Sequence, residues 1–468
     1  MTSQRVSAPW PHRIALASAL LVALGLVAGL AWTLAHRAQR RPPNVLVIAI
    51  DSLRRDRVGA YGSPHRLTPF LDELAARATV YDNAYAPSSW TIPSVASLFT
   101  GRHPSEHQTT RFMAPLKDSE TTLAEALAAH GYATSAVTAN AAIATAGGFA
   151  QGFERFQLVG VPTMDYPKSD GELINDQALR YVDEVGVERP HFLYLHFMDV
   201  HTPYRQHDGI TPPRNPALQR SDATLNLAVT SGSFEKNPER RRSYWTFTTN
   251  EVWRLEDLYD SEVAHVDRRL RQLFAALGRR GFLDNALVVV TADHGEEFGR
   301  HGAFGHGTSL YGALIHVPLI VRYPNQPPRH VEPPVQLAGL GAMIAEVVGI
   351  PRPPSFHVGW LPADPIQARQ ATAFSELLDT GQYQVWLHKR ALIDGAVKLL
   401  VTNDEQLLFY DLNTDPLERL PQPVSEELRG AMDAQVDALQ VGEMGPPVEL
   451  DEATRERLRA AGYLIDKP

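Results

Sequence analysis

The sequence predicts an α/β fold in which a large, mostly parallel central sheet is flanked by helices. Residues 44–50 and 285–291 are continuous apolar runs rich in β-branched residues, as in strands that are buried on both faces of a parallel sheet. From the first run to about residue 350, strand and helix patterns alternate as in βαβ units. Near the C-terminus, residues 391–401 and 405–412 predict two strands of a hairpin around Thr402-Asn-Asp404.

An apolar segment precedes the predicted sheet. Residues 14–35 are 22 residues without a charge, long enough to cross the hydrocarbon core of a membrane, whereas the apolar part of a secretory signal spans only about 7–15 residues. We therefore predict a transmembrane helix at residues 14–36, between a tail of residues 1–13 and a linker of residues 37–43. Because Thr33-Leu34-Ala35 resembles a cleavage site, a removed signal is the alternative. Arginines on both sides of the span do not settle its orientation.

Local signals predict the helices and loops that follow. Caps, proline positions and helical spacing predict helices over residues 68–80, 121–130, 251–280 and, near the C-terminus, 425–439. Residues 203–248, rich in Pro, Arg, Asn and Thr, predict an irregular insertion that could form one wall of a site. A Pro-rich stretch at residues 351–365 marks a domain boundary.

Composition excludes several classes of function. The net charge of −9 argues against a nucleic-acid partner, which usually demands a basic patch. The chain has no cysteine, which excludes disulfides and thiolate metal sites. Metal ligands must therefore be carboxylate, imidazole or hydroxyl groups, which suit Mn, Zn, Mg or Ca without choosing among them.

Polar residues follow three of the predicted strands. Asp51 ends the first strand, Asp293 and His294 end the strand at 285–291, and Asp199 and His201 follow a strand at 192–197. Ligands of open α/β sheets bind beyond the carboxyl ends of the strands, so we expect these side chains to meet at one edge. For Asp199 the alternative is that it only caps the turn before His201.

Thr91 lies at the start of a short apolar helix, with Pro93 in the first turn. The free backbone N–H groups and the positive end of the helix dipole favour an anion beside its hydroxyl. The alternative is that Thr91 is an ordinary N-cap.

These motifs together resemble the sulfatase family of the alkaline phosphatase superfamily. The resemblance lies in five segments: Asp51-Ser-Leu-Arg54, residues 90–101, Phe197-Met-Asp-Val-His-Thr-Pro-Tyr204, Thr291-Ala-Asp-His-Gly-Glu-Glu297 and Gly305-His-Gly-Thr-Ser-Leu-Tyr311. It covers about residues 43–322 and resumes weakly near 398–417. It implies an alkaline-phosphatase/sulfatase-like domain at residues 44–350, the Pro-rich linker at 351–365, and a subdomain with a small sheet at 366–468.

One position departs from the family. Working sulfatases carry Cys or Ser, oxidised to formylglycine, where this chain has Thr91, and the arginine of that motif is replaced by Val95. Formylglycine chemistry is therefore not expected. Thr is, however, the nucleophile in similar enzymes such as lipoteichoic-acid synthases and phosphoethanolamine transferases, whose single divalent metal is held by residues that match Asp51, Thr91, Asp293 and His294. Ser52, where many sulfatases have a second metal-binding aspartate, also favours a single ion.

The resemblance implies further roles. His201 matches a histidine that contacts the ester oxygens, and His306 falls near a lysine that contacts the substrate. Asn140 lies roughly where sulfatases carry a Lys-x-His pair that binds the sulfate group, and that pair is missing. Glu296 and Glu297 are expected to support the site or to face solvent. We thus predict Thr91, His201 and His306 as catalytic residues and Asp51, Thr91, Asp293 and His294 as ligands of one divalent ion.

Three functions fit this sequence. The first is a hydrolase of sulfate or phosphate esters with Thr91 as nucleophile. The second is a membrane transferase of a phospho-alcohol, of the phosphoethanolamine or phosphoglycerol type, and the third is an inactive relative that binds anions. The expected partner is an anionic ester, which a lipid or a glycan could carry. By analogy with anchored relatives, we expect a single-pass membrane protein whose catalytic domain lies outside the cytoplasm.

Overall fold

A computed structural model describes residues 41–111, 114–143, 147–160, 171–186, 188–210, 214, 218–234, 242–360, 371–378, 388–402, 406–442 and 452. Residues Pro43–Pro468 form one compact unit. The predicted transmembrane helix at residues 14–36 lies outside the described residues. Within the described ranges, no helix is both long enough and apolar enough to span a bilayer.

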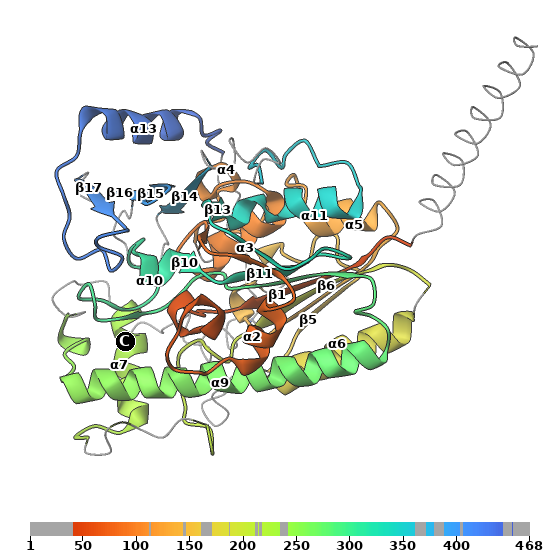
Figure 1. Cartoon of the computed structure of the whole chain (residues 1–468), viewed down its shortest axis with the longest axis horizontal. Helices are drawn as coiled ribbons and strands as arrows, with labels where there is room; N and C mark the ends of the chain where they lie inside the picture. The colour runs from red at the N-terminus through yellow and green to blue at the C-terminus, as the bar shows by residue number, and fades with distance from the viewer. Residues whose placement is uncertain are drawn as a thin grey trace, which may run out of the picture. The chain divides into compact units, whose positions relative to one another are not determined.

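An eight-stranded sheet forms the centre of the molecule (Figure 1). Across the sheet the strands are β12 (Arg329–Val331), β2 (Thr79–Tyr81), β11 (Leu319–Arg322), β7 (Ala286–Thr291), β1 (Asn44–Ile50), β6 (His191–Phe197), β4 (Ala133–Thr138) and β5 (Arg155–Leu158). Only β11 runs antiparallel to its neighbours, so the prediction of a mostly parallel sheet is confirmed. The apolar side chains of β1 and β7 are buried, as their continuous apolar character predicts.

Helices cover both faces of this sheet (Figure 1). One layer contains α2 (Pro69–Ala75), α6 (Gly171–Val185) and α9 (Thr249–Arg279), and the other contains α3 (Thr91–Thr100), α5 (Leu123–Ala128) and α11 (Leu340–Val348). Shorter elements are α4 (Pro104–His107), α7 (Asp222–Phe234), α10 (Gly312–Ile315), β3 (Ala84–Tyr85), β8 (Glu297–Phe298), β9 (Phe304–Gly305), β10 (His316–Val317), β13 (Val335–Gln336) and 3-10 turns at Arg55–Arg57, Gly59–Tyr61, Ala141–Ile143 and Leu337–Gly339.

A small antiparallel sheet follows near the C-terminus, as the family resemblance implies. Its strands are β14 (Thr372–Leu377), β15 (Lys389–Asp394), β16 (Val397–Val401) and β17 (Leu407–Asp411), and α13 (Glu426–Asp437) packs beside them. The segment at 351–360, which begins the predicted linker, buries Phe356 completely.

Three local predictions are wrong in part. The helix predicted over residues 68–80 ends at Ala75, because the β-branched Thr79 and Val80 join the sheet as part of β2. The strand predicted over residues 391–401 is two strands, because the chain turns back at Gly395 with a φ of +58°. The insertion predicted as irregular contains α7.

Candidate functional site

The predicted site residues converge at the carboxyl ends of β1, β6 and β7. Asp51 directly follows β1, while Asp293 and His294 follow β7. Because β1 pairs in parallel with β6 on one side and β7 on the other, the chains leave the sheet next to one another. His201 lies four residues beyond β6, after a turn in which its N–H donates to Met198 O.

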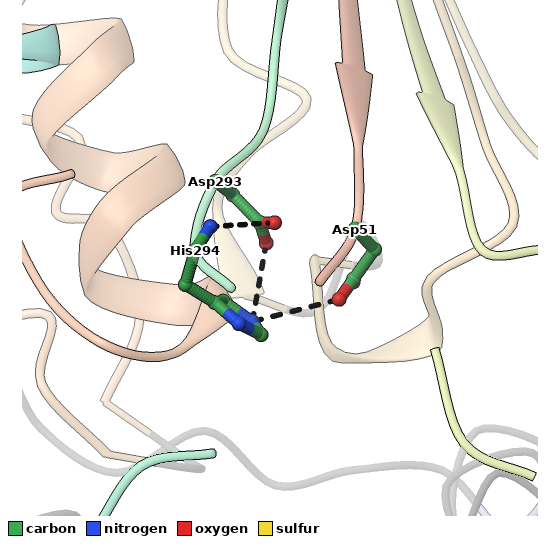
Figure 2. Close-up of side chains that lie close together, drawn as sticks. All are labelled: Asp51, Asp293 and His294. Carbon is green, nitrogen blue, oxygen red and sulfur yellow. Dashed lines mark hydrogen bonds and ion pairs between the residues drawn. The ribbon is translucent and has the colours of Figure 1, made fainter. Parts of the chain in front are cut away.

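Asp51, Asp293 and His294 form a buried cluster whose ligand atoms all lie within 4.8 Å of one another (Figure 2). The His294 Nε2 atom is 3.5 Å from Asp51 Oδ1 and 3.6 Å from Asp293 Oδ2. His294 Nδ1 lies 2.8 Å from Gly295 O, to which an Nδ1–H can donate, and Nε2 faces the two carboxylates. In the described part of the chain, Asp293 Oδ2 is buried without a hydrogen-bond partner. Two carboxylates and one imidazole around an orphaned oxygen fit a divalent cation.

The charges of this cluster also favour a bound divalent cation. Burial, followed by the negative charge of Asp51, raises the pKa of Asp293 to about 8. Burial would also raise the pKa of Asp51, but His201, His196 and His294 together hold that pKa well below its usual range. One carboxyl thus takes up a proton while its neighbour stays ionised, which is how two close buried acids behave without a cation between them.

Thr91 is the first residue of α3, and its hydroxyl points at the same cluster. Its Oγ1 atom donates to Asp51 Oδ2 at 3.3 Å and lies 3.3 Å from His294 Nε2. The N-cap position belongs to Trp90, so the alternative that Thr91 is an ordinary N-cap is wrong. The side chain is 1 % exposed, which leaves the hydroxyl shielded from bulk water.

His201 and His306 lie next to this cluster. The ring centre of His306 lies 4.8 Å from that of His201 and 4.5 Å from that of His294. Burial lowers the pKa of His201 to about 4 and that of His306 to about 3. Both rings are therefore neutral near pH 7 unless an anion beside them stabilises the charged form.

Glu296 orients His306 instead of facing solvent. Its Oε1 atom lies 3.1 Å from His306 Nδ1, and its Oε2 atom accepts a 2.6 Å hydrogen bond from the Tyr204 hydroxyl. Burial raises the pKa of Glu296 to about 7. Glu297 is also buried but binds the neighbouring loop, where it lies 3.0 Å from His301 Nδ1.

Two residues near Asp51, Asn140 and His196, bind its carboxylate, which the sequence did not indicate. Asn140, where the sulfate-binding pair is missing, donates to Asp51 Oδ2 at 2.8 Å and to Thr91 Oγ1 at 3.4 Å. His196, which the sequence did not single out, places Nε2 3.1 Å from Asp51 Oδ2. The only signal for His196 was an imidazole inside an otherwise apolar strand.

Asp199 and Arg54 lie outside the cluster. Asp199 accepts the N–H of Gly171 at 3.1 Å and so fastens the start of α6. Arg54 is 3 % exposed and donates to Asp56 and to the carbonyl oxygen of Glu296 instead of contacting the cluster. Ser52 donates to Asp51 Oδ1 at 3.0 Å.

Comparison with known proteins gives this site its context. The Sulfatase family model matches residues 43–350. The chain belongs to the sulfatase family. It is 27% identical to arylsulfatase A of Homo sapiens, in an alignment that spans 84% of this chain and 85% of that protein. It is 21% identical to the N-acetylglucosamine-6-O-sulfatase of Bacteroides thetaiotaomicron, over 66% of this chain and 71% of that protein.

Solved structures show the same fold. A 2-O GAG sulfatase superposes with a TM-score of 0.68 at 20% identity, over 89% of this chain and 100% of that one. The phosphonate monoester hydrolase of Agrobacterium radiobacter superposes with a TM-score of 0.65 at 19% identity, over 84% of this chain and 95% of that one. This sulfatase-family chain thus shares its fold with a protein named as a sulfatase and with one named as a phosphonate monoester hydrolase.

Proposed function

We propose that this sulfatase-family chain is a metal-dependent hydrolase of sulfate or phosphate esters in which the unmodified hydroxyl of Thr91 is the nucleophile. The observation that carries the proposal is the position of Thr91 Oγ1, 3.3 Å from both Asp51 Oδ2 and His294 Nε2. A hydroxyl beside two candidate metal ligands, at the start of a helix, is placed to attack an anionic ester.

Asp51, Asp293, His294 and the Thr91 oxygen would hold one divalent ion. When bound, such an ion lowers the pKa of a hydroxyl that it contacts and balances negative charge on the ester. The structure does not distinguish Mn, Zn, Mg and Ca, all of which accept carboxylate oxygen ligands.

The residues of the chain have separate roles in the proposed reaction. Thr91 gives its proton to a water molecule that enters the site with the ester, its oxygen bonds to the sulfur or phosphorus atom, and the bond to the leaving oxygen breaks. The anion raises the pKa of the adjacent His201 and His306, and whichever ring is protonated gives its proton to the leaving oxygen. Glu296 holds the ring of His306 in place through Nδ1.

The sulfate or phosphate ester that forms on Thr91 must be broken by a second nucleophile. The Thr91 side chain has one oxygen on Cβ, so it cannot expel the group by forming a carbonyl as a geminal diol can. Water must therefore attack the sulfur or phosphorus atom. We expect phosphodiesters to be better substrates than aryl sulfates, because both formylglycine and the Lys-x-His pair are missing.

Turnover of an ester panel by Thr91 variants tests this proposal. Purified full-length protein is assayed with an aryl sulfate, an aryl phosphate monoester, an aryl phosphodiester and an aryl phosphonate monoester. Thr91→Ala should lower kcat at least about a thousandfold on the best ester, whereas Thr91→Ser should retain part of it. Intact-peptide mass spectrometry of residues 88–102 should show unmodified threonine. Wild-type activity in the alanine variant, or a modified residue 91, would rule out this mechanism.

We further propose that an uncleaved helix at residues 14–36 tethers the catalytic domain outside the cytoplasm. What supports it is the 22-residue apolar run of the sequence, which exceeds the need of a secretory signal. A reporter that is active only outside the cytoplasm, fused after Pro468, should be active. An inactive reporter would overturn the orientation, and a product shorter by about 35 residues would identify a cleaved signal.

A further inference from the structure

A cavity of about 730 Å³ lies between the catalytic domain and the C-terminal sheet. We call it the junction cavity, and its lining includes Arg54, Arg55, Arg300, Tyr85, Gly395 and Pro416. Its lining residues include none of Thr91, His201 and His306, so it is separate from the catalytic cluster. Its volume is that of a site for an organic molecule and far exceeds the needs of a single ion.

The carboxylates around the junction cavity already have cationic partners. Asp56 accepts two hydrogen bonds from Arg54, at 2.9 and 2.6 Å. Glu418 is bound by Lys398 Nζ at 2.6 Å and by the N–H of Gly312 at 2.7 Å. These two acids are therefore already neutralised, and the remaining acid of the lining, Glu332, is exposed.

Arg55 and Arg300 also line the junction cavity. In the part of the chain that the structure describes, Arg55 Nε is buried without a hydrogen-bond partner, and the guanidinium lies 4.7 Å from the centre of the Tyr61 ring. Among the described residues, the carboxylate that pairs with Arg300 is Asp56, whose Oδ2 atom lies 3.9 Å from Nη2 and also binds Arg54. A half-buried guanidinium with an unsatisfied N–H is costly unless an acceptor occupies the adjoining space.

We propose that the junction cavity binds an organic anion through a phosphate or sulfate group held by Arg55 and Arg300. Guanidinium groups bind such oxyanions with charge-assisted, often paired hydrogen bonds. Tyr85, Pro334 and Leu412 supply the apolar part of the lining that the body of the ligand would cover. The site goes beyond the proposed hydrolase function, because the bound group lies away from Thr91.

Calorimetric titration of purified, metal-loaded full-length protein tests the junction cavity. The probes are inorganic phosphate and phenylphosphonate, whose carbon–phosphorus bond is not an ester. We expect Arg55→Gln to weaken one class of binding sites at least about tenfold, as loss of a charge-assisted hydrogen bond does. The exposed Arg77→Gln is the matched control and should bind as wild type does. Tighter binding of phenylphosphonate than of phosphate would identify an organic ligand, whereas equal binding would identify the free anion and overturn the organic ligand.

A catalytic-site variant separates the junction cavity from the proposed active site. His306→Ala should weaken anion binding at the catalytic cluster and leave the Arg55-dependent binding intact, while Arg55→Gln should leave kcat on the best ester unchanged. Arg300→Gln provides a second test if Arg55→Gln unfolds. The proposal is overturned if neither arginine variant changes binding, if wild type binds neither probe, or if His306→Ala abolishes all binding. Binding that depends on Arg55 in a protein without esterase activity would contradict the proposed function alone.

Discussion

Besides Thr91, three donors fix the orientation of Asp51, the central carboxylate of the candidate metal centre. His196 and Asn140 contact its Oδ2 atom at 3.1 and 2.8 Å, and Ser52 donates to Oδ1 at 3.0 Å. Since Tyr194 lies 2.9 Å from His196 Nδ1, its hydroxyl can donate there while Nε2–H donates to Asp51. His196 is therefore a positioning residue, which acts on the ion through the carboxylate that it holds.

Replacing His196 should weaken metal binding without removing a ligand. We expect His196→Ala to lower metal affinity about 10–100-fold, the usual effect of losing a partner of a ligand. Tyr194→Phe, which removes only the hydroxyl behind the ring, is the matched control and should have a smaller effect. Competition with a chromophoric chelator measures the affinities. Equal affinities of His196→Ala and wild type would show that His196 does not support the site.

The start of helix α2 depends on a buried acid from another helix. Asp267, on α9, accepts the N–H of Phe70 at 3.0 Å and that of Leu71 at 2.9 Å, so it satisfies donors that the first turn leaves free. The residue is 1 % exposed, and burial raises its pKa to about 6. The folded protein therefore holds a proton at Asp267 over a pH range in which the unfolded chain has lost it.

This difference predicts a pH dependence of stability. Because the folded pKa lies above the unfolded value, wild type should lose stability relative to Asp267→Asn as the pH rises from about 4 to about 6, by roughly 1–3 kcal/mol. Urea unfolding of both proteins at several pH values gives the difference in free energy of unfolding. A difference that stays constant across this range would contradict the raised pKa.

At the scale of the whole molecule, a buried ion pair joins the C-terminal sheet to the loop that follows His306. Lys398, on β16, donates to Leu310 O and to Glu418, both at 2.6 Å, and Glu418 accepts the N–H of Gly312 at 2.7 Å. Both side chains are buried. Through this ion pair the small sheet is bound to residues 310–312, which connect His306 to β10.

Removing one member of the Lys398–Glu418 pair should lower the free energy of unfolding more than removing both. Lys398→Met leaves Glu418 buried without its cation, and we expect a loss of about 3–5 kcal/mol. Adding Glu418→Gln to this variant should recover part of the loss. Denaturant unfolding measures the three free energies. A double variant less stable than Lys398→Met would contradict this account.

Metal removal should affect the whole catalytic unit, because the candidate ligands come from the ends of β1 and β7 and from the start of α3. We expect chelation to lower the Tm of wild type on the order of 5 °C, since an ion that binds only the folded state stabilises it. The Tm of Asp293→Asn should fall less on chelation. A Tm that chelation leaves unchanged, in protein that also contains no metal by elemental analysis, would contradict the metal centre.

The sequence alone determined the central sheet and the convergence of Asp51, Asp293 and His294, and the family resemblance added Thr91 to them. Apolar β-branched runs identify strands that are buried on both faces, and the carboxyl ends of parallel strands meet at one edge. Local signals were less reliable where tertiary pairing overrode them. Thr79 and Val80 extend a helical pattern but join β2, and Gly395 divides what reads as one strand.

Only the tertiary structure decided which residues support the site. In a strand buried on both faces, polar and apolar positions do not alternate, so nothing in the sequence says where His196 points. The pairing of β1 with β6 places His196 opposite Ala49, two residues before Asp51, and this brings the imidazole to the carboxylate. The junction cavity likewise depends on packing between distant segments, from Arg55 to Pro416. Such contacts follow from register and docking, which spacing along the chain does not encode.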